Sequence, residues 1–586
     1  MSICSSGSNH NLYKQQQIAS KNGLLSLKPG ARIPPALLRL LFGDNGSSYN
    51  KDTSDEESLN TANSSSTDSL SPASLSFKKQ LARSVYALSM HSAYLAIAYA
   101  DRYMLLERPE EITASANNYR LVSVGSEAAM AGELITALYC LGVYVPQQGS
   151  AKQGSTYKSQ SLCVAVGYSS GYLRIFSLYG HLLTSHRFHS QPLIRIRLRV
   201  PFQGKESDDL QDGHIWNYSI NENQNDNFSE YDNGGVGRFN IGSSDGGATE
   251  DAEEMCLTYA DGTMVSIDGQ SLYLALRLCL NEAASAESDE PIFQYKKWAF
   301  DLNMPLVSDA VSYGPALFRD PLSSLAKASL TSSPLLSDAT ARFIVAPQHG
   351  DAVFGIFMTN EDATMSFSAV DIAGKVAAKV TGAVLNIAKS YFWRSSPQPT
   401  PRISDANKHG IAGSDDPGTV VPCAFAIRDN PRKVLDISLA PAPYNLAALT
   451  DSLGRVLLFD LENCEVVHML KGLRGSQCAW LEMESSDHEG AADGLQGLFR
   501  NRRLFIVVYA GRRGTVEIFE LGSLERPIAS VSVGLGWKLV QCPTQLLGGS
   551  LVVGTAGKSR RAAAPSLASC MLFSENGQAA SIRLAI

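Results

Sequence analysis

The chain has 586 residues, of which 44% are hydrophobic and 18% charged, and its formal net charge is -7. This composition excludes a wholly disordered chain, and the acidic balance argues against nucleic acid as a partner, because phosphate binding needs a basic surface. The ten cysteines include no Cys-x-x-Cys pair, which excludes zinc-knuckle and thioredoxin-type motifs. The most apolar window is shorter than the roughly 20 residues that cross a bilayer, so we expect a cytoplasmic protein.

The first 80 residues divide into two parts. Residues 34–42 (PPALLRLLF) predict a short helix, since proline is tolerated in a first helical turn. Residues 43–76 are rich in Ser, Asn, Asp and Thr and hold almost no large apolar side chain, which predicts a disordered linker. We therefore expect residues 1–80 to precede the folded domain, which would span residues 81–586.

From residue 81 onward one local pattern recurs: an apolar strand, a polar turn that ends in glycine, and an alternating strand. A glycine at such a position supplies the positive φ of a tight hairpin turn, and the alternation has the strand period of two. The copies are CVAVGYSSGYLRIF (163–176), CLTYADGTMVSI (256–267), FIVAPQHGDAVFGIF (343–357), LAALTDSLGRVLLF (446–459) and LFIVVYAGRRGTVEIF (504–519), with a weaker one at 95–106.

A single hairpin buries too little to be stable, but hairpins repeated around a ring bury one another. The repeats therefore predict an all-β fold, a WD-like β-propeller with seven blades. A β-sandwich is the alternative architecture, and it usually takes about 100 residues per domain. Six or more copies of one unit favour the propeller.

Long insertions interrupt the repeats, and we expect them on the rim of the ring. Residues 205–254 hold thirteen acidic and two basic residues, which predicts a flexible acidic loop. Residues 395–418 are rich in Pro, Ser and Asp and predict a second disordered insertion.

Residues 370–394 carry a helical signal, with apolar residues at steps of three and four. A basic amphipathic helix that ends in aromatics can lie on an anionic membrane. The alternative is a helix packed on the flank of the ring, with solvated lysines. The residues expected to touch the membrane are Lys375, Lys379, Lys389, Phe392 and Trp393.

Two short motifs are candidate partner contacts. Tyr295, Lys296, Lys297 and Trp298 interleave aromatic and basic residues, as binding hot spots do, although such a pattern is more often a strand with inward aromatics and outward lysines. Arg512 and Arg513 lie at a hairpin turn, where they could contact a partner, act as an arginine finger or simply be solvated.

The motif census gives no catalytic centre. His181, His186 and His189 have spacings that suit neither a helix face nor one strand side, so we expect no metal site there. The chain lacks a Walker A loop, an HExxH motif and a dinucleotide fingerprint. We therefore expect a protein that is not an enzyme and that has no catalytic residue, cofactor or metal. An enzyme with its site in the central channel stays an alternative.

Several of these segments resemble a known family. The stretches CVAVGYSSGYLRIFSLYGHLL (163–183), MVSIDGQSLYLALRLCLNE (264–282), YKKWAF (295–300), LAALTDSLGRVLLFD (446–460) and FIVVYAGRRGTVEIFE (505–520) are similar to the N-terminal region of the non-catalytic, regulatory subunit of the Rab-three GTPase-activating protein complex. The resemblance runs from about residue 81 to the end of the chain. Members of that family are usually longer, with a large helical C-terminal part, so we expect this chain to hold the ring portion.

The resemblance implies a regulatory scaffold with defined partners. In that family the regulatory subunit binds a catalytic subunit, which supplies the arginine finger, and the complex acts on a Rab-family small GTPase. The complex also promotes nucleotide exchange on a Rab connected with the endoplasmic reticulum, and it takes part in membrane traffic and autophagy. The expected location is the cytoplasm, peripheral to the endoplasmic reticulum or other membranes. A generic propeller adaptor that links membranes to proteins is the alternative function.

Overall fold

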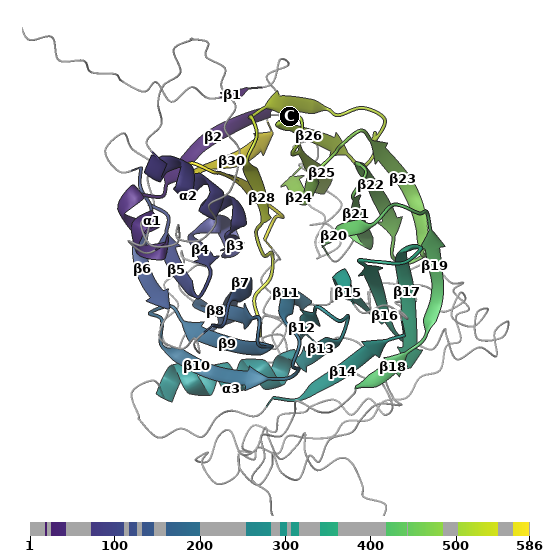
Figure 1. The fold of residues 1–586 in the computed structure, drawn as a ribbon, viewed down its shortest axis with the longest axis horizontal. Helices are drawn as coiled ribbons and strands as arrows, with labels where there is room; N and C mark the ends of the chain where they lie inside the picture. Colours follow the sequence, from purple (N-terminus) through teal and green to yellow (C-terminus); the bar gives the residue numbers. More distant parts are fainter. Residues whose placement is uncertain are drawn as a thin grey trace, which may run out of the picture.

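The strands form seven mainly antiparallel sheets arranged around a central opening (Figure 1). This computed structural model describes residues 18–19, 25–42, 72–109, 117–125, 132–145, 160–199, 253–282, 293–301, 306–315, 340–360, 418–441, 444–484, 502–548 and 566–584. Within these ranges each sheet has four or five strands, so the chain is a seven-bladed β-propeller, as predicted, and not a β-sandwich. We number the blades 1 to 7 by the order of their inner strands.

In blades 1, 2, 5 and 6, four consecutive strands run from the opening to the outer edge. Blades 1 and 2 contain β3 (Val85–Leu88), β4 (Tyr94–Tyr99), β5 (Arg102–Glu107), β6 (Arg120–Gly125), β7 (Ile135–Tyr144), β8 (Gln160–Tyr168), β9 (Tyr172–Ser177) and β10 (Leu182–Arg187). Blades 5 and 6 contain β20 (Val434–Leu439), β21 (Leu446–Asp451), β22 (Arg455–Asp460), β23 (Glu465–Lys471), β24 (Ser476–Glu484), β25 (Arg502–Ala510), β26 (Thr515–Glu520) and β27 (Ala529–Ser532).

Blades 3 and 4 share a crossing segment at their outer edges. Blade 3 contains β11 (Leu193–Arg199), β12 (Glu254–Tyr259), β13 (Met264–Asp268), β14 (Tyr295–Phe300) and β18 (Thr419–Val421), and blade 4 contains β15 (Val307–Pro315), β16 (Thr340–Pro347), β17 (Ala352–Asn360) and β19 (Cys423–Arg428). β18 pairs in parallel with β14, and the chain then continues into β19, which pairs antiparallel with β17. One segment thus ties two blades together.

Blade 7 closes the ring by joining the two ends of the chain. It contains β28 (Trp537–Gln541), β29 (Cys570–Ser574) and β30 (Gln578–Leu584), followed outward by β2 (Leu25–Arg32) and β1 (Ile18–Ala19). In the register, Leu25 lies opposite Leu584 and Leu27 opposite Ile582. The predicted start of the folded domain at residue 81 therefore leaves out two strands of the ring, β1 and β2.

Three α-helices lie among the described residues, with one short 3-10 turn (Met90–Ser92). α1 (Pro35–Phe42) confirms the predicted short helix, whereas α2 (Pro72–Arg83) begins inside the stretch predicted as a linker. Sequence analysis missed α3 (Gly269–Glu282), whose first turn is capped by Asp268, because its carboxylate accepts from the Ser271 N–H at 2.7 Å. α3 packs on blades 2 and 3 through Leu272 and Leu276.

The core of the described part of the chain consists of seven apolar clusters, one between each pair of neighbouring blades. Alternate residues of one strand enter different clusters: Leu95 and Ile97 of β4 face blade 7, while Ala96 and Ala98 face blade 2. This is the period of two that the sequence predicted. Because the cluster between blades 7 and 1 is present, the ring is closed by packing as well as by strand pairing.

The two faces of the ring carry different connections. Because the four innermost strands of each blade alternate in direction, the inner strands of all blades run the same way through the ring. We call the side on which the inner strands end the insertion face. We call the side on which they begin the turn face. The predicted insertion 205–254 and the connection that contains 395–418 follow β11 and β17, and both therefore leave from the insertion face. The prediction of a flexible loop is wrong at its end, because Glu253 is buried and Glu254 begins β12.

Candidate binding surfaces

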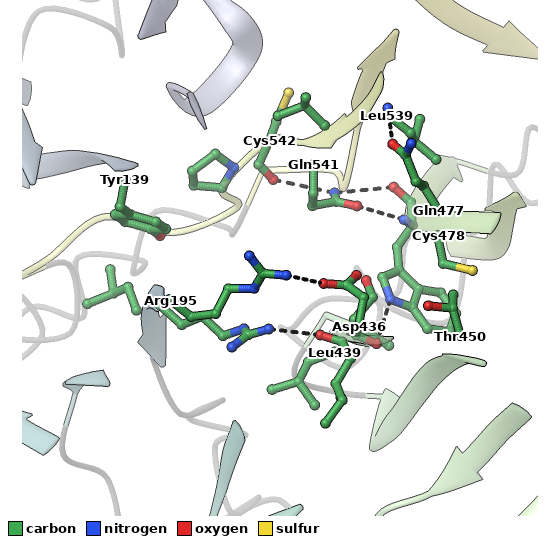
Figure 2. A pocket seen from close by; sticks show the side chains of 18 of the residues that line it. Tyr139, Arg195, Asp436, Leu439, Thr450, Gln477, Cys478, Leu539, Gln541 and Cys542 are labelled. Atoms are coloured by element: carbon green, nitrogen blue, oxygen red, sulfur yellow. Dashed lines mark hydrogen bonds and ion pairs between the residues drawn. The ribbon is translucent and has the colours of Figure 1, made fainter. Parts of the chain in front are cut away.

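A cavity of about 870 Å³ occupies the centre of the ring and is lined by the inner strands of all seven blades. Figure 2 shows some of its side chains, which include the polar groups of Arg195, Asp436 and Gln541 beside apolar ones such as Leu439 and Leu539. Three arginines of β11, at positions 195, 197 and 199, line it together. In a strand, residues two apart lie on the same side, so this triplet forms a ladder that faces blade 4.

Arg197 is the central member of the ladder. Its guanidinium makes a bidentate pair with the carboxylate of Asp309 on β15, at 2.9 and 2.7 Å, and also donates to the carbonyl of Ile437 on β20 at 3.0 Å. Asp309 is fully buried and accepts from the Ile437 N–H at 2.9 Å. These contacts join blades 3, 4 and 5.

The other two arginines also hold carboxylates. Arg195 lies 3.0 Å from Asp436, as Figure 2 shows, and Arg199 lies 2.7 Å from Glu254. Burial raises the pKa of Asp436, although the charge of Arg195 opposes the shift. Burial would likewise raise the pKa of Glu254, but Arg199 and the hydroxyl of Ser312 together lower it below its usual value.

Asp309, Asp436 and Glu254 are therefore each paired with an arginine of one strand, β11. Acid–base catalysis needs a carboxyl group that is free to exchange a proton with a substrate, and an ion pair with arginine opposes that. The network suits a rigid hub better than a reaction centre. Sequence analysis missed it, although the alternation of arginines in LIRIRLR (193–199) was visible.

A half-buried lysine, Lys538, lies on the other side of the channel. The Lys538 ammonium group donates to the carbonyl of Ser84 and lies 5.1 Å above the ring of Tyr86. Burial lowers its pKa from the usual 10.5 to about 8. This contact links blade 7 to the segment that enters blade 1.

The predicted contact at residues 295–298 lies on β14, and half of it is core. Trp298 is 2% exposed and packs on Phe343 with ring centroids 5.5 Å apart, in the cluster between blades 3 and 4. Lys297 is 6% exposed, and its ammonium donates to the carbonyl of Phe188 at 3.2 Å. Neither side chain is available to a partner in this structure, because the adjacent blades cover them. Tyr295 and Lys296 are half-buried.

Arg512 and Arg513 lie in the turn between β25 and β26, on the turn face, and both are exposed. The Arg512 N–H donates to the carbonyl of Arg474 at 3.2 Å, so a third exposed arginine lies beside them. Sequence analysis missed Arg474, although it stands next to a glycine in a turn, as Arg513 does.

The five predicted membrane residues, Lys375, Lys379, Lys389, Phe392 and Trp393, lie outside the described residues, as does most of 395–418. In the described part of the chain, no helix is long and apolar enough to span a membrane.

The histidines do not gather at one point. His189 bonds to Asp261 at 2.7 Å in a turn-face contact between blades 2 and 3, and His186 packs edge-on against Phe293. Over the described ranges, no group of three His, Cys, Asp or Glu side chains could hold a metal ion.

Comparison with protein families decides the relationship. The family described as "Rab3 GTPase-activating protein regulatory subunit N-terminus" matches residues 81–214 and 236–540, which include strands of all seven blades. The chain belongs to this family. As a member of the Rab3 GTPase-activating protein regulatory subunit family, it is a non-catalytic component of a Rab GTPase-activating complex.

Two solved structures are similar to this family member over most of its length. The crystal structure of Saccharomyces cerevisiae Sqt1 is 11% identical, covers 85% of this chain and 83% of its own, and has a TM-score of 0.35. The C-terminal WD40 domain of Sif2 is 10% identical, covers 86% of this chain and 95% of its own, and has a TM-score of 0.31. The propeller assignment rests on the strand pairing within the chain itself.

Proposed function

We propose that this chain is the scaffold on which a catalytic subunit assembles to act on a Rab-family small GTPase. The observation that carries the proposal is the family match across the ring. The partner supplies the arginine finger that stabilises charge in the transition state of GTP hydrolysis. This chain supplies a rigid body that holds the partner and the GTPase together.

The geometry supports a scaffold because the ring is tied at several independent places. Strand β2 pairs with β30, Asp309 joins three blades, and Lys538 connects blade 7 to blade 1. A body that is fixed in this way presents its loops in constant relative positions, which lowers the entropic cost of binding.

We further propose that the complex promotes nucleotide exchange on a Rab connected with the endoplasmic reticulum, and that it works in membrane traffic and autophagy. The amphipathic segment 370–394 would then bring the insertion face toward an anionic membrane, since its connection follows β17. We therefore propose that the chain acts in the cytoplasm, peripheral to membranes.

Co-purification tests the proposal. The tagged full chain, expressed in cells of its source, should retain a Rab GTPase-activating catalytic subunit through a stringent wash. A generic propeller adaptor predicts traffic or autophagy proteins without that subunit, and recovery of this second set alone would overturn the proposal.

A further inference from the structure

Three arginines from two connections meet on the turn face of blade 6. Arg474 lies between β23 and β24, and Arg512 and Arg513 lie between β25 and β26. The two connections are joined by backbone hydrogen bonds, from the Arg512 N–H to the Arg474 carbonyl at 3.2 Å and from the Gly511 N–H to the Gly475 carbonyl at 3.1 Å. We call these three residues the arginine cluster.

The backbone beneath the arginine cluster is fixed. Gly475 and Gly514 both have φ of 65°, a conformation that costs a glycine little, and the Gly514 N–H is bonded to the Ala510 carbonyl at 2.9 Å. An added Cβ on Gly514 would lie 2.5 Å from Gly534, so the next connection is packed directly against this turn. The side chains are therefore presented from a rigid base.

The arginine cluster carries an excess of positive charge. Among the described residues, the only acidic side chain that pairs with the arginine cluster is Glu517, which lies 3.5 Å from Arg513. The Arg513 side chain remains 53% exposed. Exposed Lys471 lies at the end of β23, just before Arg474. Since the whole chain has a net charge of -7, this sector is locally opposite in sign to the protein as a whole.

Exposed leucines flank the arginine cluster on both sides along the ring. Leu453 is 44% exposed and precedes Gly454, whose carbonyl accepts from the Leu473 N–H at 2.9 Å. Leu535 is 66% exposed and follows Gly534, whose N–H donates to the Gly514 carbonyl at 3.0 Å. Four neighbouring connections of the turn face thus present, in order along the ring, Leu453, Arg474, the pair Arg512 and Arg513, and Leu535.

We propose that the arginine cluster with Leu453 and Leu535 is a docking site for an acidic, leucine-bearing segment of a partner protein. Arginine forks match carboxylate geometry and bind it through two parallel hydrogen bonds. The flanking leucines bury apolar side chains of the same segment. Charge complementarity favours this occupant over a membrane, because the arginines stand between the leucines and would have to lose water before both leucines could insert. The proposal names a surface and a ligand chemistry, and it holds whichever partner supplies the segment.

The test uses the full chain and a labelled peptide of repeated Glu-Glu-Leu units, with binding followed by fluorescence anisotropy. The wild-type chain binds, and raised salt weakens the binding. The triple variant Arg474→Glu, Arg512→Glu, Arg513→Glu loses roughly tenfold or more in affinity, because like charges now face the peptide. The single variants Leu453→Ser and Leu535→Ser weaken binding of this peptide but not of a Glu-Glu-Ser peptide.

A matched control separates site loss from a general charge effect. Arg526 is exposed in the connection between β26 and β27, on the insertion face of the same blade, so Arg526→Glu should leave peptide affinity unchanged relative to Arg512→Glu. An unaltered melting temperature shows that the variants fold. Equal peptide binding by the triple variant overturns the proposal, and so does binding to phosphatidylserine vesicles without binding to the peptide. If the wild-type chain binds the peptide but does not recover a catalytic subunit from cells, the proposed scaffold function fails and the docking site stands.

Discussion

Arg197 of β11 and Asp309 of β15 form a bidentate ion pair at 2.9 and 2.7 Å inside the central channel. The same carboxylate accepts the backbone N–H of Ile437, so one buried side chain fixes the positions of three inner strands. The inner strands of a propeller surround an opening, and ion pairs of this kind connect neighbouring inner strands around it.

Asp309→Ala should lower the free energy of unfolding by about 3–5 kcal/mol, because removing one partner leaves a mostly buried charge uncompensated. Urea unfolding measures this. Asp436→Ala is the matched control: Asp436 and Arg195 are 39% and 42% exposed, so the expected loss is less than about 1 kcal/mol. Equal losses would mean that Asp309 is not the tie between blades.

Leu27→Ala should lower the free energy of unfolding by about 2–4 kcal/mol, because Leu27 is 3% exposed between blades 6 and 7. Chemical denaturation checks this, with Lys28→Ala as the control, since Lys28 is exposed on the same strand. A Leu27 variant as stable as the wild type would show that β2 does not close the ring.

Lys538→Met should stabilise the fold at neutral pH. The folded-state pKa is lowered from 10.5 to about 8, so the protonated form is disfavoured in the folded state. Wild-type stability should therefore rise as pH increases from about 8 to 10.5 and be lowest below that window. The lowered pKa sets an upper limit of about 3.5 kcal/mol on the stabilisation, at about 1.4 kcal/mol for a pKa change of one.

The advantage of the Lys538 variant should shrink as pH rises, because the wild type then loses the buried charge. Stability measured by urea unfolding near neutral pH and again in the alkaline range follows this change. Lys28→Met, at an exposed position, should have the same free energy of unfolding as the wild type at both pH values. Parallel pH profiles for Lys538→Met and the wild type would contradict the explanation.

The sequence predicted the repeating unit well, and it predicted long-range partners poorly. The hairpin CVAVGYSSGYLRIF (163–176) carries its own turn glycine and alternation, so β8 and β9 were evident from local pattern. Strand β2 was not evident from the local pattern, because Pro29 and Gly30 interrupt its alternation. Its partner β30 lies far from it in the sequence. The aromatics of 295–298 were ambiguous, because burial of Trp298 depends on blade 4.

A peptide of residues 370–394 should float with liposomes that contain anionic lipid and not with neutral liposomes, if this segment is the membrane contact. Lys375, Lys379 and Lys389 replaced by Gln should abolish the anionic preference, since each basic residue near such a surface contributes roughly 1 kcal/mol. Flotation that is absent, or indifferent to anionic lipid, would leave the alternative of a helix packed on the ring.

GTP hydrolysis by the Rab recovered with this chain tests the central claim most directly. Single-turnover rates are compared for the Rab alone, with this chain, with the catalytic subunit, and with both. A non-catalytic scaffold predicts no acceleration by this chain alone and a faster rate with both proteins than with the catalytic subunit alone. Acceleration by this chain alone, or an unchanged rate when it joins the catalytic subunit, would contradict the account.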